Sequence, residues 1–270
     1  MDLKEVKERI KEIESLSYDE HTPENYKEFL EKIRKIYDGN RQLLVSPYYT
    51  DSFTCFRARS NDKKFFERIC DVWYPPAEKV TPGRLNFPNE PIFYCATDLN
   101  TAVIEIRPKL NDLITILETR ITEPEMRCLQ FVKENYNQGD LKNMDPVKKE
   151  IFEFVHRQLR SIVPDGQFQG YYATQIFKKA IDNTKFDAIA YDSVATSFKG
   201  YNFAIHAEYV DKHSKFVSAR VVKVIEYNNQ ENFKVKCLFK SSSKNDLGKI
   251  EFDQFLLCDG HSINLKNYGH

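Results

Sequence analysis

The sequence predicts an α+β protein in which helices and strands follow one another without strict alternation. Some segments place apolar residues at helical spacing, whereas others are short runs of β-branched, aromatic and alternating residues that are typical of strands. Because the two kinds do not alternate regularly, an α+β class with a mixed β core and flanking helices is expected. At 270 residues, the chain is long enough for one large domain or a domain with appendages.

The N-terminal segment is predicted to form two helices. Apolar residues over 3–16 recur every three or four positions, with Lys and Glu between them. A second helix is expected over 22–39, with Thr22 as its N-cap and Pro23 at its first position. We interpret residues 1–45 as a helical appendage whose charged faces are most simply solvated surface, with binding to a partner as the alternative.

Strands are predicted from about Ser52 onward, with helices between some of them. The expected strands cover 53–59, 92–96, 113–121, 128–132, 186–191 and 202–208, and a terminal hairpin or meander is expected over 216–227 and 233–240. Asp98 is expected to cap a helix that ends near Ile106, and further helices are expected over 147–162 and 171–181. We therefore expect a main domain over 46–221, with a β-rich C-terminal extension over 222–270 packed on it.

Composition and charge limit the classes of function. Lys+Arg and Asp+Glu both number 40, so the formal net charge is zero, which disfavours non-specific binding to nucleic acid. No apolar run approaches the roughly 20 residues that span a bilayer. The N-terminus lacks the apolar core of a signal peptide. These features predict a cytoplasmic protein without nucleic-acid or membrane partners.

A metal site is not expected. The six cysteines are scattered without a C-x-x-C pair, and the six histidines form no H-E-x-x-H arrangement. The interpretation that fits is reduced and mostly buried thiols.

Two arginines are candidates for binding phosphate groups. Arg84 lies in a turn between Gly83 and Asn86, and such a turn can place a guanidinium fork against phosphate oxygens. An incidental arginine in a surface turn is an equally good interpretation. Arg57 stands near the end of an apolar strand, and its pattern alone is better explained by a solvated arginine on an edge strand.

A glutamate and a serine are candidates for the chemistry itself. Glu105 follows three apolar residues on its predicted helix, and a carboxylate in such a place is either partly exposed or functional. Ser193 follows the strand predicted over 186–191, where binding groups are common, although a serine in a turn is ordinarily a turn former or cap. No G-x-S-x-G elbow surrounds Ser193, which disfavours a hydrolase nucleophile.

Taken in order, the motifs around these residues resemble the RES domain family. They are Phe56-Arg57, Gly83-Arg84-Leu85-Asn86, Phe93-Tyr94, Ala102-Val103-Ile104-Glu105, Tyr191-Asp192-Ser193 and Gly200-Tyr201-Asn202. The resemblance covers roughly 53–208. RES domains are typically toxins of bacterial toxin–antitoxin pairs that consume NAD by phosphorolysis or hydrolysis of the nicotinamide–ribose bond, or transfer ADP-ribose to a protein. Their fold is similar to that of ADP-ribosylating toxins.

The resemblance implies catalytic roles for Arg57, Glu105 and Ser193. Glu105 would stabilise the positive charge that develops on the ribose as nicotinamide leaves. Arg57 and Arg84 would hold the pyrophosphate, and Ser193 would donate a hydrogen bond to a phosphate or to the ribose. The choice of Arg57 over Arg59 as the family arginine depends on the register. The resemblance also implies NAD-binding roles for Tyr94, Tyr74 and Asn202.

Two classes of function follow from the sequence. The first is an NAD-consuming enzyme, with phosphate, water or a protein side chain as the acceptor, and with NAD as a substrate. The second is a non-catalytic nucleotide-binding or interaction module on the same fold. Retention of the arginine, glutamate and serine together favours the enzyme, because a binder of an anionic ligand does not need a carboxylate. An antitoxin, if one exists, is expected to be a separate protein that covers the pocket.

Overall fold

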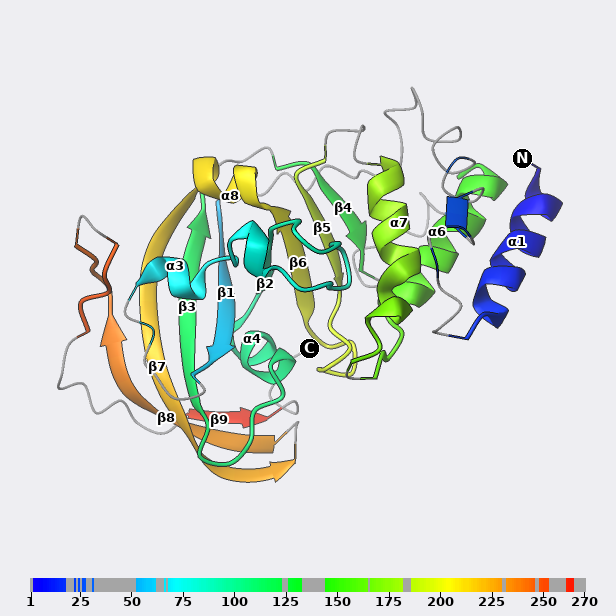
Figure 1. Cartoon of the computed structure of the whole chain (residues 1–270). Helices are drawn as coiled ribbons and strands as arrows, with labels where there is room; N and C mark the ends of the chain where they lie inside the picture. Colours follow the sequence, from blue (N-terminus) through cyan, green and yellow to red (C-terminus); the bar gives the residue numbers. More distant parts are fainter. Residues whose placement is uncertain are drawn as a thin grey trace. The chain divides into compact units, whose positions relative to one another are not determined.

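The structure is a computed structural model of the chain (Figure 1), and it divides into two compact units. The first unit comprises Met1–Tyr48, Ala77–Glu90 and Arg127–Tyr191, and the second comprises Tyr49–Pro76, Pro91–Met126 and Asp192–His270. The structure describes residues 2–17, 22, 24, 26, 27, 31, 52–61, 66, 68–122, 126–132, 144–164, 166–181, 186–229, 232–245, 248–252 and, for the backbone, 261–264.

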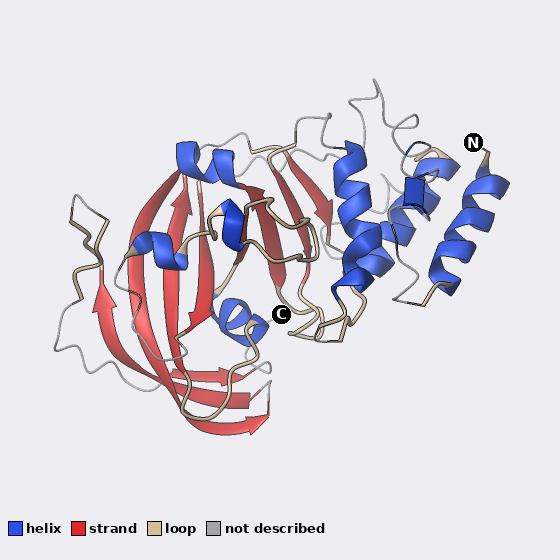
Figure 2. Ribbon diagram, in the orientation of Figure 1, coloured by secondary structure: helices blue, strands red, loops and turns tan. Residues whose placement is uncertain are grey.

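Helices make up most of the described part of the first unit (Figure 2). They are α1 (Leu3–Ser15), α6 (Pro146–Leu159) and α7 (Tyr172–Ile181), with the short 3-10 helices η2 (Ala77–Lys79) and η3 (Phe168–Tyr171). Helix α1 begins with a capping box between Asp2 and Glu5. It lies against α6, with an ion pair of 3.0 Å between Glu14 and Arg157.

Two parallel strands complete the first unit. They are β4 (Cys128–Phe131) and β5 (Ala188–Asp192), with Cys128 opposite Ala188. The ring of Phe131 stacks on Phe152 of α6 at 4.7 Å and meets the edge of Phe177 of α7 at 5.6 Å. These buried rings join the strands to both helices and form the core of this unit.

The second unit contains an antiparallel sheet in the order β6-β2-β1-β3-β7-β8-β9. Its strands are β1 (Phe53–Ser60), β2 (Ile92–Ala96), β3 (Leu113–Ile121), β6 (Tyr201–His206), β7 (Ser214–Asn229), β8 (Asn232–Ser241) and β9 (His261–Asn264). Register shifts interrupt the pairing of β7 with β8, and both strands bend strongly (Figure 1). Three short helices belong to this unit: α3 (Ile69–Val72), α4 (Leu99–Glu105) and α8 (Ala207–His213).

Helix α4 packs on one face of this sheet. Asp98 is its N-cap and accepts a hydrogen bond of 2.9 Å from the backbone N–H of Thr101. The apolar residues before Glu105 are buried in one cluster with the side chains of β1, β3, β7 and β8: Ala58, Ile114, Ile116, Val222, Val224, Phe233 and Val235. This burial fixes the helix on the sheet and leaves its last residue, Glu105, exposed.

The predicted α+β class is confirmed, and each predicted helix and strand in the described part of the chain is present within a few residues. Sequence reasoning missed the short elements α3, α8, η2, η3 and β9. The second N-terminal helix, expected over 22–39, lies largely outside the described residues. Among the described helices, none is both long and apolar enough to cross a membrane.

Candidate functional site

A carboxylate held by two buried donors lies at the end of α4. Ser193 Oγ donates a hydrogen bond of 2.6 Å to Oε1 of Glu105, and Asn202 Nδ2 donates one of 2.5 Å to the same oxygen. The exposed fraction is 0% for Ser193 and 5% for Asn202, whereas Glu105 is exposed. The structure therefore brings three of the predicted residues together, with one face of the carboxylate open.

The two donors to Glu105 offset an unfavourable position on its helix. As the final residue of α4, Glu105 lies at the end of the helix where the backbone dipole disfavours a negative charge. Among the described residues, Ser193 and Asn202 are the partners of its carboxylate, and Oε2 accepts no hydrogen bond from any of them. The carboxylate is thus held through Oε1, and Oε2 is available to a ligand.

Ser193 is positioned by a closed loop between β5 and β6. Its backbone N–H donates to the carbonyl of Gly200 at 2.7 Å, and its carbonyl accepts from the N–H of Phe198 at 2.9 Å. Its hydroxyl oxygen accepts from the N–H of Thr196 at 3.2 Å. Strand β6 begins directly after the loop, and Asn202 is its second residue.

Tyr94 lies on the same face of the sheet as Asn202. On β2 and β6, Tyr94 is opposite Ala204 and Ala96 is opposite Asn202. Side chains two positions apart on a strand share a face, and Ala96 belongs to the cluster under α4. The half-buried Tyr94 therefore stands on the face that carries Glu105.

Arg57 lies on the other face of the sheet. The preceding residue, Phe56, packs against the cluster under α4, so Arg57 points to the opposite side. Its Nε donates to the carbonyl of Val72 at 3.0 Å and its Nη1 to the carbonyl of Tyr94 at 2.7 Å. Burial, and secondarily the charge of Arg59, lower the pKa of Arg57 to about 10. These contacts connect β1 to β2 and α3, and the NAD-binding role of Arg57 stays a prediction.

Tyr74 is held by a carboxylate of α8. Its hydroxyl donates to Oδ2 of Asp211 at 2.6 Å. Burial and this hydrogen bond raise the pKa of Tyr74 to about 12. The Tyr74 hydroxyl thus bonds to Asp211 of α8, and the NAD-binding role of Tyr74 stays a prediction.

Arg84 belongs to the first unit, whereas the Glu105 carboxylate belongs to the second. Its Nη1 donates to the carbonyls of Ser161 at 3.2 Å and Gln158 at 3.4 Å, and its guanidinium lies 4.9 Å from the ring centre of Tyr171. The two carbonyls lie at the C-terminal end of α6, where a cation is favoured by the helix dipole.

The turn that carries Arg84 is fixed by buried polar side chains. Thr174 donates to the carbonyl of Arg84, and Gln175 Nε2 donates to the carbonyl of Gly83 at 2.7 Å. Asn86, which is 2% exposed, donates to the carbonyl of Thr81 at 2.9 Å. The predicted turn is therefore present, and the Arg84 guanidinium lies at the C-terminal end of α6.

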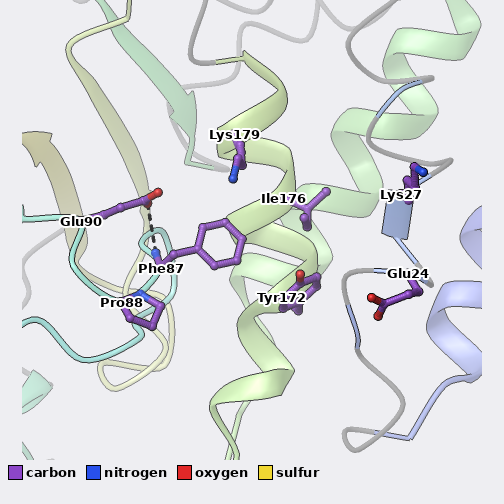
Figure 3. A pocket seen from close by; sticks show the side chains of 8 residues that line it. All are labelled: Glu24, Lys27, Phe87, Pro88, Glu90, Tyr172, Ile176 and Lys179. Carbon is purple, nitrogen blue, oxygen red and sulfur yellow. Dashed lines mark hydrogen bonds between the residues drawn. The ribbon is translucent and has the colours of Figure 1, made fainter.

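A cavity of about 710 Å³ lies within the first unit (Figure 3). It is lined by Glu24, Lys27, Phe87, Pro88, Glu90, Tyr172, Ile176 and Lys179. Phe87 and Tyr172 meet edge to face at 5.6 Å, and Lys179 lies 5.4 Å from the ring centre of Phe87. Its two lysines and two glutamates balance in charge, so the lining does not favour an anion such as NAD. The lining contains none of the site residues predicted from the sequence.

Three residues that the sequence analysis did not single out support the predicted ones. Thr196 orders the Ser193 loop, Asp211 holds Tyr74, and Gln175 holds the Arg84 turn. Gln175 offered a signal, because it stands among apolar residues of α7 and a polar side chain needs a partner when it is buried. Thr196 and Asp211 have no comparable signal in the sequence.

No group of three or more His, Cys, Asp or Glu side chains among the described residues is arranged to hold a metal ion. Of the cysteines in this part of the chain, Cys55, Cys95, Cys128 and Cys237 are buried, Cys70 is exposed, and all five are free thiols. Burial raises the pKa of the Cys128 thiol, which makes it a poor nucleophile.

A family model described as RES domain matches residues 54–227, more than half of the chain. A comparison with curated proteins found no match. Among solved structures, the chain is similar to one in the crystal structure of the M. tuberculosis MbcT-MbcA toxin-antitoxin complex. The match covers 93% of this chain and 97% of that chain, with 11% sequence identity and a TM-score of 0.39.

Proposed function

Because the chain belongs to the RES domain family, we propose that it is an enzyme that consumes NAD by breaking the bond between nicotinamide and ribose. The observation that supports this most directly is the Glu105 carboxylate, anchored through Oε1 by Ser193 and Asn202 and open at Oε2. A site that only binds an anionic dinucleotide would gain nothing from an exposed carboxylate.

Cleavage of the bond between nicotinamide and ribose suits a carboxylate that is fixed through one oxygen and open at the other. As the bond to nicotinamide breaks, positive charge develops on the ribose, and a fixed carboxylate oxygen nearby stabilises that charge. Ser193 and Asn202 hold the carboxylate in place, so little reorganisation is required when the charge forms. Tyr94, on the same face of the sheet, would stack on a ring of NAD or donate to the ribose.

The pyrophosphate of NAD would be held by arginine. Arg84 is one candidate, because its remaining guanidinium nitrogens bond to no other described residue. Arg57 keeps a role in this proposal only if NAD reaches the face of the sheet on which it lies. Tyr74, held by Asp211, would border the pocket.

The biological role we propose is that of a cytoplasmic toxin that depletes NAD, with an antitoxin as a separate protein that covers the pocket. The acceptor of the ribosyl group is phosphate or water. Transfer of ADP-ribose to a protein is the second candidate, because an acceptor side chain would approach the same open oxygen. NAD is a substrate in each case, and no metal is required.

The test is incubation of the purified protein with NAD, with and without inorganic phosphate, and chromatographic separation of nicotinamide and the ribosyl product. Release that needs phosphate would establish phosphorolysis, and release without it would establish hydrolysis. If nicotinamide appears only when a protein acceptor is added, the enzyme is an ADP-ribosyltransferase. If NAD binds but no nicotinamide forms under any of these conditions, the protein is a non-catalytic module and the proposal is wrong.

A further inference from the structure

We propose that Glu105 acts through one carboxylate oxygen, Oε2, and that Thr196 is the positioning residue that enforces this choice. The inference deepens the proposed function and depends on it. It concerns the loop from Ser193 to Gly200, which joins β5 to β6, and the contacts through which this loop controls the carboxylate.

The two oxygens of Glu105 differ in their partners. Oε1 accepts from Ser193 at 2.6 Å and from Asn202 at 2.5 Å, and two strong donors occupy the lone pairs that one carboxylate oxygen offers. Oε2 accepts from none of the described residues. The positive charge that develops on the ribose is therefore stabilised by Oε2. The two hydrogen bonds to Oε1 keep the carboxylate from rotating.

The direction of the Ser193 hydrogen bond is fixed by Thr196. The backbone N–H of Thr196 donates to Ser193 Oγ at 3.2 Å. A hydroxyl has one proton, and a backbone N–H can only donate, so the proton of Ser193 is directed to Glu105. This arrangement makes Ser193 a permanent donor to Oε1.

The Thr196 side chain closes the loop that makes this possible. Its Oγ1 donates to the carbonyl of Ser193 at 3.2 Å and accepts from the N–H of Gly200 at 2.9 Å. The side chain is fully buried, with an exposed fraction of 0%. One hydroxyl thus connects both ends of the loop, and no solvent molecule can easily replace it.

The loop needs this connection because its backbone is strained. Ser197 and Phe198 have φ values of 54° and 67°, in the left-handed region that side chains with a Cβ disfavour. This conformation is strained for such residues and persists only where the surrounding structure holds it in place. Two hydrogen bonds to the Ser193 carbonyl hold the loop in this conformation, one from Thr196 Oγ1 and one from the N–H of Phe198.

The loop also has to approach α4 closely. A Cβ on Gly200 would lie 2.0 Å from Oγ1 of Thr101, a buried residue of α4. Glycine at this position lets the base of the loop touch the helix that carries Glu105. Ser193 is hydrogen-bonded to the carbonyl of Gly200, and Asn202 lies two positions after it, so the close approach at Gly200 brings both residues near the end of α4.

The experiment compares Thr196→Val, which keeps the shape but loses the hydroxyl, with Thr196→Ser, which keeps the hydroxyl. For Thr196→Val we expect kcat for nicotinamide release to fall about 10- to 100-fold, the cost of misplacing a catalytic group by a fraction of an ångström to about 1 Å. KM for NAD should change less than about threefold, because the hydroxyl touches no ligand. Thr196→Ser should recover most of kcat.

A second readout does not need turnover. Amide hydrogen exchange over 193–200 should be slow in the wild-type protein and in Thr196→Ser, and faster in Thr196→Val. Unchanged kcat and exchange in Thr196→Val, or an equal loss in both variants, would overturn the positioning role. An inactive wild-type protein would overturn the proposed function and the assignment of Oε2 with it, whatever the exchange shows.

Discussion

Asn202 Nδ2 lies 2.5 Å from Oε1 of Glu105, although the two residues are 97 positions apart in the chain. The contact joins the start of β6, a strand of the sheet, to the end of α4, which packs on one face of that sheet. Asn202 therefore holds the Glu105 carboxylate in place. A contact between Asn202 and NAD would be additional to this role.

Asn202→Asp replaces a donor by a second carboxylate against Glu105. We expect the free energy of unfolding to fall by about 1–3 kcal/mol, because a buried hydrogen bond is lost and two negative charges are brought together. Turnover of NAD should fall by at least about 10-fold, because the carboxylate would turn away from its position. Urea unfolding and nicotinamide release measure the two effects. Asn89→Asp, on an exposed residue with φ of 64°, is the matched control and should change neither.

Gly200→Ala tests the close approach of the loop to α4. The added Cβ would lie 2.0 Å from Thr101 Oγ1 and 3.0 Å from Thr101 Cβ, so we expect destabilisation of about 1–3 kcal/mol. Adding Thr101→Ala should recover part of this loss, because it removes the nearest atom and leaves only the Cβ contact. A double-mutant cycle measured by thermal unfolding gives the coupling. Strictly additive effects would mean that the two residues do not meet.

Tyr74→Phe should show a stability difference that depends on pH. Burial and the bond to Asp211 raise the pKa of Tyr74 from 10.0 to about 12 in the folded protein. A group whose pKa is raised on folding stabilises fully below its unfolded value, and this contribution is lost as the pH rises through the folded value. The free energy of unfolding of the wild type should thus exceed that of Tyr74→Phe by a constant amount up to about pH 10, and this difference should shrink between pH 10 and 12.

The difference in the free energy of unfolding between the wild type and Tyr74→Phe should stay below about 1 kcal/mol, because Tyr74 and Asp211 are partly exposed and screened by solvent. Urea midpoints of both proteins from pH 8 to 11 measure it. A difference that grows above pH 10, or that is absent at pH 8, would contradict the hydrogen bond between Tyr74 and Asp211.

Arg57→Gln separates a role in the sheet from a role in binding NAD. Its two bonds to the carbonyls of Val72 and Tyr94 would be lost, so we expect the free energy of unfolding to fall by about 1–3 kcal/mol. KM for NAD of the folded variant should stay near the wild-type value. Arg120→Gln is the control, since Arg120 is exposed on β3 and its hydrogen bonds to Ser52 are at the surface. Unchanged stability together with a much larger KM would instead identify Arg57 as an NAD contact.

The regular elements could be predicted because their signals are local. Asp98 before an apolar run predicted α4, and the alternating residues of β7 and β8 predicted their hairpin. The short helices α3 and α8 were missed because a few residues cannot carry a helical period. Their stability depends on packing that only the folded chain reveals.

The candidate site was predicted only in part, for a physical reason. Glu105, Ser193 and Asn202 were identified through motifs, and their meeting depends on contacts across 88 and 97 positions of the chain. Which side of β1 Arg57 occupies depends on where the flanking helices pack, and its own sequence does not contain that information. Thr196 acts through a hydroxyl inside a loop, and loops of this kind have no sequence period.

In the proposed function, the open carboxylate of Glu105 carries the chemistry on NAD. Glu105→Gln keeps the size of the side chain and removes its charge, and Glu226→Gln, in an exposed ion pair with Lys234, is the matched control. We expect Glu105→Gln to lower nicotinamide release by at least about 100-fold while NAD binding, measured by calorimetry, changes little. Glu226→Gln should behave as the wild type. If Glu105→Gln releases nicotinamide at the wild-type rate, or if the wild type binds NAD without cleaving it, the account is wrong.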